Sequence, residues 1–178
     1  MSNPFQLVDF ENERSKEAED LIKLAGKEQV AVDPGVYSGL PEQTTDVKQP
    51  ELLWASLAMA DGLLRSALQA RISKIQNFET QMPRTGSAAA GAFNGLVEVP
   101  MHLEFTALAS NAEELIYSLP SRSEELRAAG WTNAPAEKPP LFIERLIMRK
   151  ESADKPDEVH VLMQVVGFAM REPAQPMD

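Results

Sequence analysis

The sequence contains two long segments in which apolar and polar residues alternate, and this alternation constrains the fold more than any other feature. In the first segment the apolar residues occupy every second position, at Val97, Val99, Met101, Leu103 and Phe105. The second segment repeats this rhythm with Val159, Val161, Met163 and Val165. Alternation with a period of two is typical of a β-strand with one buried face. The sequence therefore predicts two long strands that each turn one apolar face toward a core.

A helix, a shorter strand and a long strand occur twice in the same order, over residues 50–107 and 110–170. In the first copy a helix is predicted after Pro50, because apolar residues recur on one helical face: Leu53, Leu57, Ala60, Leu64 and Leu68. In the second copy, capping-box patterns beginning at Ser110 and Ser121 predict two helical pieces, the second ending at Gly130. The shorter strands are expected at residues 72–78 and 141–150.

Two such units can bury their apolar faces by merging four strands into one antiparallel sheet with both helices on one side. The order αββαββ is a circular permutation of the ferredoxin-like arrangement. The sequence thus predicts an α+β, ferredoxin-like domain over residues 50–171. Residues 1–49 are expected to form an N-terminal helix, with a stop at Gly26, and an irregular arm. Residues 172–178 are expected to be a disordered tail.

The composition excludes several classes of protein. The chain of 178 residues has no cysteine, so a disulfide, a thiolate metal site and a thiol nucleophile are impossible. Seventeen basic and 27 acidic residues give a net charge of −10, which disfavours binding to nucleic acid and to anionic membranes. No apolar run reaches the roughly 18 residues of a membrane span. Two interpretations stay open: a soluble cytoplasmic protein, if residue 1 is the native start, or a soluble piece cut just after a membrane anchor.

Two histidines are present, His102 and His160, and both lie on the polar side of a long strand. A sheet of this type could bring them together, and with Glu104 they could hold a metal ion. We expect instead two half-exposed strand residues, because two imidazoles without a third ligand make a poor site. Glu98 and Glu104 share this face with His102, but no nucleophile motif accompanies them. No catalytic residue, cofactor or metal is therefore expected.

The last long strand is apolar on both faces in its second half. Four residues lie on the face opposite Val161 and Val165: Leu162, Val166, Phe168 and Met170. A strand that is apolar on both sides is usually covered on both sides, so this face is predicted to meet the N-terminal arm, a second copy or a different subunit. We expect these four residues to form an interaction surface.

Two further expectations concern charged and aromatic residues. Glu144, Arg145 and Arg149 could pair across the sheet with Glu98 or Glu104, and such cross-strand pairs would indicate nothing beyond the register of the sheet. Trp54 and Trp131 are expected to be packing residues, because no other aromatic residue lies near either of them in the sequence.

Four parts of the sequence follow one another in a recognisable order: the stretch from Val99 to Phe105, a helix with Glu113-Glu114-Leu115-Ile116, and the stretches Leu141 to Leu146 and Val159 to Phe168. Together they resemble the periplasmic domain of the PilO family of type IV pilus proteins. The chain is also similar to the general secretion pathway protein M family and to related membrane proteins of verrucomicrobial pilus operons. In those families a strand of the Val-Pro-(apolar)-x-(apolar) type leads into a helix that packs on the sheet. The likeness covers about residues 50–170.

This resemblance implies a non-enzymatic scaffold with a short cytoplasmic tail, one membrane helix, a coiled-coil-like segment and this domain in the periplasm. Such a domain dimerises or pairs with a sister protein in the inner-membrane platform of type IV pili or type II secretion. The present chain lacks the membrane helix, so membrane attachment is expected only through an anchor outside it.

Two other functions stay open. One is a small-molecule-sensing regulatory module of ferredoxin-like fold, with a ligand between its helices or at a dimer interface. The other is an enzyme or metal protein that uses His102 and His160.

Overall fold

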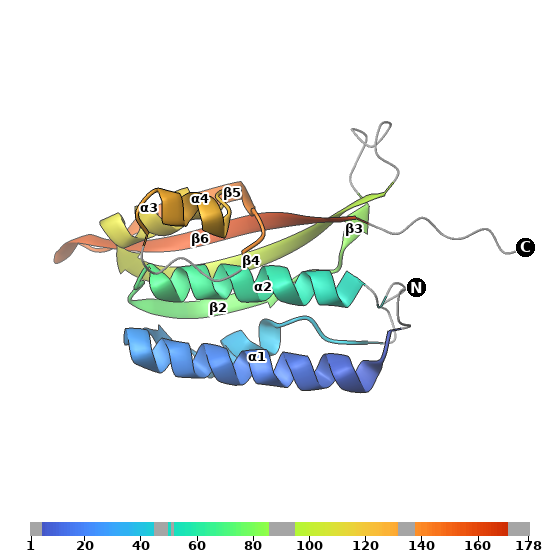
Figure 1. Cartoon of the computed structure of the whole chain (residues 1–178). Helices are drawn as coiled ribbons and strands as arrows, with labels where there is room; N and C mark the ends of the chain where they lie inside the picture. The colour runs from blue at the N-terminus through green and yellow to red at the C-terminus, as the bar shows by residue number, and fades with distance from the viewer. Residues whose placement is uncertain (1–4, 45–49, 51, 86–94, 132–137, 171–178) are drawn as a thin grey trace, which may run out of the picture.

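The computed structural model of the chain describes residues 5–44, 50, 52–85, 95–131 and 138–170. The elements follow in the order α1 (Leu7–Glu28), β1 (Ala31–Val32), the 3-10 helix η1 (Pro34–Gly39), α2 (Leu52–Gln69), β2 (Lys74–Thr80), β3 (Arg84–Thr85), β4 (Leu96–Leu108), α3 (Ala109–Ser118), α4 (Ser123–Ala128), β5 (Phe142–Ser152) and β6 (Lys155–Met170). They form an α+β fold (Figure 1), in which α2 and α3 contact β4 and β6 while α1 packs against α2.

The described residues form one sheet of six strands. Five of them follow the order β1-β2-β4-β6-β5, and β3 pairs with β4 beside that path. β2, β4, β6 and β5 pair antiparallel, whereas β1 pairs parallel with β2. The α+β class is confirmed. The four-stranded antiparallel detail is not, because two strands of two residues each, too short to show any periodicity, make the sheet larger and mixed.

β4 and β6 pair along almost their whole length and join the two tandem copies. The residues that the alternation places inward are at most 7% exposed: Val97, Val99, Met101, Leu103, Phe105, Val159, Val161, Met163 and Val165. Phe105 lies opposite Ile75 of β2 on one side and Val161 of β6 on the other. Side chains from both copies therefore share a single core.

The helix α2 covers this core with the face that the sequence predicts. Its stripe residues are at most 4% exposed: Leu53, Leu57, Ala60, Leu64 and Leu68. Gly167 of β6 lies beneath α2, since a Cβ atom there would overlap the sulfur of Met59 and lie 3.1 Å from Leu141 Cδ2. The small residue thus lets the helix approach the sheet closely.

Three predicted helix ends are wrong. α1 continues through Gly26 to Glu28 and ends at Gln29, which has a φ of 58°, because burial of Ala25 against the core outweighs the low helix propensity of one glycine. α3 begins at Ala109 without a side-chain cap, since β4 leads straight into it. α4 is capped one residue later than predicted and by a single bond: the Arg122 backbone N–H donates to Glu125 Oε2 over 2.7 Å, and the donor-only guanidinium of Arg122 cannot complete a capping box.

The segment expected to be an irregular arm contains β1 and η1, and both lie alongside β2. The Ala31 N–H donates to the carbonyl oxygen of Ser73, and the Asp33 N–H donates to that of Ile75. Residues 45–49 of the expected arm and 172–178 of the expected tail lie outside the described residues. In the described part, the arm therefore extends one edge of the sheet.

Gly39 is the point where η1 meets the backbone of β2. A Cβ atom at residue 39 would overlap the carbonyl oxygen of Phe78 and lie 2.7 Å from its carbonyl carbon. A backbone atom cannot turn aside as a side-chain end can, so Gly39→Ala is expected to lower the free energy of unfolding by about 2–3 kcal/mol, measured by urea denaturation. Gly35→Ala is the matched control, because no described residue lies within 4 Å of the added atom. Equal, small effects of the two substitutions would contradict this close approach.

Candidate interaction surfaces

The sheet has an inner face, which α2 covers, and an outer face formed by the alternate side chains. On β4 the outer residues are Leu96, Glu98, Pro100, His102, Glu104, Thr106 and Leu108, and on β6 they include His160, Leu162, Gln164, Val166, Phe168 and Met170. The N-terminal arm does not cover this face in the described residues, because α1 packs on α2 and both β1 and η1 lie against β2. The four residues predicted as an interaction surface thus lie on the face opposite the helices.

One end of the outer face carries a cluster of exposed apolar side chains, called the outer-face patch: Leu96, Phe142, Phe168 and Met170. Their exposed fractions range from 38% for Leu96 to 70% for Met170. Leu96 lies opposite Met170 in the sheet, and the rings of Phe142 and Phe168 are 5.8 Å apart between centroids. Two of the four predicted residues, Val166 and Leu162, contribute less, since Val166 is only 9% exposed and Leu162 lies farther along β6.

A charged bridge crosses the outer face beside this patch. Arg84 of β3 donates from Nε to Glu98 Oε2 over 3.1 Å and from Nη2 to Glu144 Oε2 over 3.0 Å. The predicted cross-strand pairs are wrong in their partners, because Arg84 joins the carboxylates and neither Arg145 nor Arg149 forms an ion pair among the described residues. Sequence reasoning missed Arg84 because β3 has only two residues. Exposed bridges of this kind stabilise a fold by at most about 1 kcal/mol.

The two histidines do not share a site. His160 Nε2 lies 2.9 Å from Glu104 Oε1. His102 faces Gln164 of β6, four residues along the strand from His160, which corresponds to roughly 13 Å. The described residues contain no group of three side chains that could hold a metal ion. The hypothesis of an enzyme or metal protein built on His102 and His160 therefore lacks the geometry that it requires.

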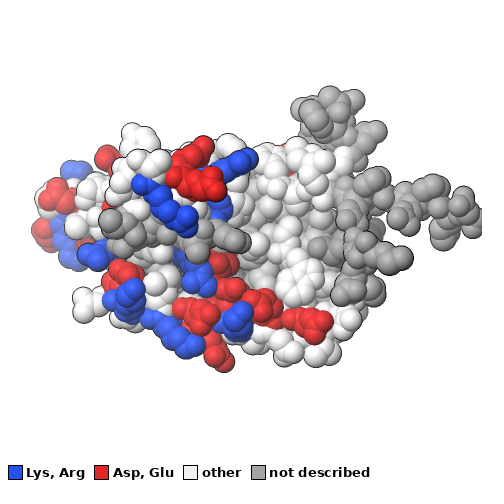
Figure 2. Space-filling model, in the orientation of Figure 1, with Lys and Arg blue, Asp and Glu red and all other residues white. Residues whose placement is uncertain are grey.

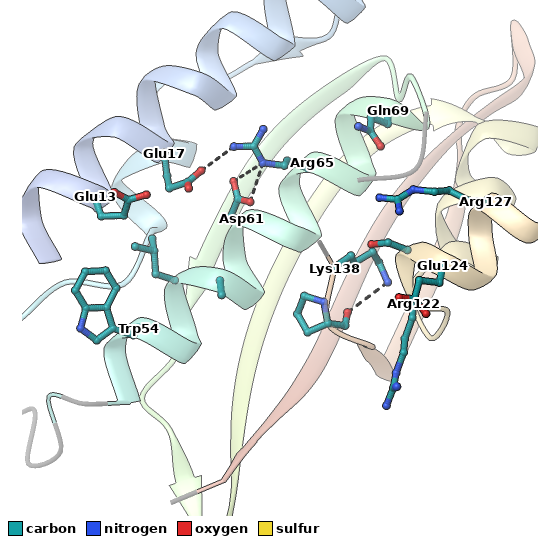
Figure 3. A pocket seen from close by; sticks show the side chains of 14 residues that line it. Glu13, Glu17, Trp54, Asp61, Arg65, Gln69, Arg122, Glu124, Arg127 and Lys138 are labelled. Atoms are coloured by element: carbon teal, nitrogen blue, oxygen red, sulfur yellow. Dashed lines mark hydrogen bonds and ion pairs between the residues drawn. The ribbon is translucent and has the colours of Figure 1, made fainter. Parts of the chain in front are cut away.

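The helix side of the molecule contains a cleft of about 1150 Å³ between α1, α2 and α4 (Figure 3). One face of α2 supplies Trp54, Asp61, Arg65 and Gln69. Arg65 Nε donates to both carboxylate oxygens of Asp61 over 2.8 and 2.7 Å, and its Nη2 donates to Glu17 Oε2 of α1 over 2.7 Å. This network fixes α1 to α2. The sequence analysis missed it, although Asp61 and Arg65 stand at the i, i+4 spacing of a helical ion pair.

Buried polar groups line the other wall of the cleft. Lys138 is 5% exposed, and its ammonium group donates to the carbonyl oxygens of Leu119 and Ser121 over 2.5 and 2.8 Å. Burial lowers the pKa of Lys138 to about 8. Ser123 is 6% exposed, and its Oγ has no hydrogen-bond partner among the described residues. Lys138 thus satisfies carbonyl groups at the end of α3, whereas Ser123 retains unused hydrogen-bonding capacity.

The cleft predicts a pH dependence of stability. Burial raises the pKa of Asp61 from its ordinary 3.8 to about 6, against the opposing effect of Arg65. The folded protein then binds this proton more tightly than the unfolded chain, so the contribution of Asp61 to stability is complete below about pH 4 and is lost as the pH rises through about 6. Between about pH 4 and pH 6, the unfolding free energy of the wild type is expected to fall by about 2–3 kcal/mol more than that of Asp61→Asn. Denaturation at a series of pH values measures this difference.

Asp20→Asn is the control for this experiment, because a hydrogen bond from Lys23 lowers the pKa of Asp20. Its contribution has the opposite sign, being lost as the pH falls below about 4. A wild-type pH profile that matches the Asp61→Asn profile between pH 4 and 6 would contradict the assignment to Asp61.

No protein-family model matches the chain, and no curated protein matches it. Solved structures do share its fold. A structure from Akkermansia muciniphila, described as being without its transmembrane region, has a TM-score of 0.66 and 12% identity, over 98% of this chain and 91% of that one. Another crystal structure from the same bacterium has a TM-score of 0.69 and 12% identity, over 99% and 84%. The resemblance to verrucomicrobial membrane proteins that the sequence indicates is therefore confirmed at the level of the fold.

The type 4 fimbrial biogenesis protein PilO from Pseudomonas aeruginosa is less similar, with a TM-score of 0.43 and 7% identity over 85% of this chain and 98% of that one. Within the described residues, no helix combines the length and apolar character that crossing a bilayer requires.

Proposed function

We propose that this chain is a non-enzymatic structural component of an inner-membrane platform of the type IV pilus or type II secretion kind. It acts by protein–protein contact, with a second copy of itself or with sister proteins of the platform. The shared fold supports this proposal, because one structure of that fold is described as lacking its transmembrane region. By the same analogy, the full-length protein is anchored in the inner membrane and holds this domain in the periplasm.

The observation that carries the proposal is the outer-face patch. Its four large apolar side chains are neighbours on a sheet face that the described part of the N-terminal arm leaves open. Soluble monomers rarely expose large contiguous apolar patches, and patches rimmed by polar residues commonly mark protein interfaces. Here Arg84, Glu98 and Glu144 supply such a rim. The patch is therefore where a partner docks.

The neighbouring edge strand indicates how the partner docks. β5 has irregular register at Ile143/Arg145 and at Lys150/Ser152, and five of its eleven residues are charged. Bulges and charges on an edge strand oppose pairing with a strand of another chain. A partner therefore packs its side chains onto the outer face and does not extend the sheet beyond β5.

Sedimentation velocity of the full chain, alone and mixed with candidate platform proteins of the same organism, tests the proposal. We expect a concentration-dependent dimer or a complex with a sister protein. A strictly monomeric species at high concentration, without binding to any sister protein, would overturn it.

We also propose that residues 50–171 fold as a permuted ferredoxin-like domain. The order β2-β4-β6-β5, with α2 before β2 and α3 before β5, supports a permuted ferredoxin-like domain over residues 50–171. Residues 1–49 then form a helix and arm that dock onto it.

The cleft favours a second candidate function, a small-molecule-sensing module. Ser123 Oγ and Gln69 Oε1 both line the cleft, and neither has a hydrogen-bond partner in the part of the chain that the structure describes. A thermal-shift screen against metabolites separates this candidate from the first, because a ligand that binds only the folded state raises the melting temperature. A shift that occurs in the wild type and disappears in Ser123→Ala would favour sensing.

A further inference from the structure

Charged residues are arranged differently on the two sides of the molecule. On the helix side, basic and acidic side chains intermingle over α1, α2 and α4 (Figure 2), and several pair with close neighbours, as Arg65 does with Asp61. On the outer face, two exposed residues of opposite charge, Glu79 of β2 and Arg145 of β5, form no ion pair among the described residues. These two side chains therefore remain available to another molecule.

Glu79 and Arg145 belong to one row of residues that crosses the sheet. Glu79 lies opposite His102 of β4, and Arg145 lies opposite Gln164 of β6. His102 and Gln164 are themselves paired. Neighbouring strands lie about 4.8 Å apart, so the backbones of Glu79 and Arg145 are roughly 14 Å apart, at equal distances on either side of the line between β4 and β6. Opposite charges placed in this way meet when a second copy is turned by 180° about that line.

The outer-face patch is arranged about the same line. Leu96 of β4 lies directly opposite Met170 of β6, so the line passes between them. In a second copy turned about it, Met170 lies over Leu96 of the first copy and Leu96 lies over Met170, with Phe168 beside this contact. The apolar patch thus meets itself, which is what a two-fold interface between identical chains requires.

A two-fold axis that runs across the strands does not give this match. It would lay β5 of one copy along β5 of the other, so that Arg145 and Arg149 of the two copies approach one another. Like charges brought face to face oppose association. They would separate only if the overlap shrank to the patch itself, and most of the outer face would then stay uncovered. The axis parallel to the strands is therefore the favoured one.

We infer that a second copy of this chain covers the outer-face patch, with a two-fold axis parallel to the strands, so that Arg145 of each copy forms an ion pair with Glu79 of the other. The inference rests on the proposed function and deepens it, because it chooses the second copy over a sister protein. The two sheets pack face to face with their strands aligned within about 30°. The apolar patch supplies affinity, and the ion pairs at the margin fix the orientation.

Charge reversal in the full chain tests the inference, with the dimer dissociation constant measured by sedimentation equilibrium. Arg145→Glu and Glu79→Arg each bring like charges together at both symmetry-related contacts, so each is expected to weaken the dimer at least about tenfold. The double variant exchanges the two charges and is expected to regain the wild-type affinity. Both positions are exposed, and circular dichroism verifies that the variants are folded.

Mixing the two single variants gives a sharper readout. In a mixed dimer, the acidic side chain introduced at position 145 faces the basic one introduced at position 79, and the native Arg145 and Glu79 face each other. We therefore expect each variant to dimerise poorly alone, and an equimolar mixture to dimerise as tightly as the wild type. A mixture that associates as weakly as the separate variants overturns the inference.

Arg149→Glu is the matched control. Arg149 is also exposed on the outer face of β5 and forms no ion pair among the described residues. Its row leads through His160 and Thr106 to Lys74 of β2. The two-fold axis therefore places Arg149 over a basic residue, and Arg149→Glu is expected not to weaken the dimer. Equal weakening by Arg149→Glu and Arg145→Glu overturns the inference, because a general loss of positive charge then accounts for both.

The outcomes separate this inference from the proposed function. A chain that stays monomeric but binds a platform protein, and loses that binding on Phe168→Ala, overturns the inference and supports the proposed function. A chain that dimerises with no effect of either charge reversal also overturns the inference alone. A strictly monomeric chain that binds no platform protein overturns both.

Discussion

Replacing Phe105 with alanine is expected to lower the free energy of unfolding by about 3–5 kcal/mol, the largest effect on stability among the substitutions considered. The ring is fully buried and lies between Ile75 of the first copy and Val161 of the second. Its removal leaves a cavity at the point where the two copies share their core. Chemical denaturation monitored by circular dichroism measures the change.

Tyr117→Ala is the control for Phe105→Ala, because Tyr117 is a large aromatic residue that is 75% exposed on α3. We expect it to change the unfolding free energy by no more than about 0.5 kcal/mol. A loss below about 1 kcal/mol for Phe105→Ala, or two separate unfolding transitions in the wild type, would contradict a single shared core.

Replacing Phe168 with alanine is expected to weaken binding of the platform partner about 30-fold or more, the largest effect on function. Buried aromatic residues at the centre of an interface typically contribute at least about 2 kcal/mol to binding, which corresponds to that factor. Phe168 is suited to this role, because it packs against Phe142 at the centre of the outer-face patch and is still 40% exposed. Isothermal titration calorimetry with the partner identified by sedimentation measures the loss.

Leu108→Ala provides the matched control for Phe168→Ala. Leu108 lies on the same outer face, at the opposite end of β4, and is 48% exposed. If the patch is the interface, Leu108→Ala leaves the affinity unchanged. A similar loss in both variants would indicate a general effect on the sheet, and no loss in either would remove the outer-face patch from the interface.

The long elements of this fold could be predicted from the sequence because their periodicity extends over many residues. Alternation at Val97 to Phe105 indicates β4, alternation at Val159 to Val165 indicates β6, and the leucine stripe indicates α2. Burial enforces these patterns, since a shift by one residue would turn the apolar side chains of a strand to the wrong face. The same reasoning placed Phe168 and Met170 on the face away from the helices.

Features that depend on distant neighbours could not be predicted in this way. β1 and β3 consist of two residues each, and their pairing is decided by β2 and β4 rather than by local propensity. The bridge from Arg84 to Glu144 joins residues 60 positions apart, and the bond from Arg65 to Glu17 joins residues 48 positions apart.

Site-specific photo-crosslinking in the native cell tests the central claim most directly. A photoreactive amino acid is placed at Met170, which is 70% exposed in the outer-face patch, or at Tyr117, which is 75% exposed on the helix α3. The account predicts that position 170 crosslinks to a second copy of the chain or to a membrane protein of the platform, whereas position 117 does not. A folded and expressed protein that gives no crosslink at position 170, or gives the same crosslinks at both positions, would contradict it.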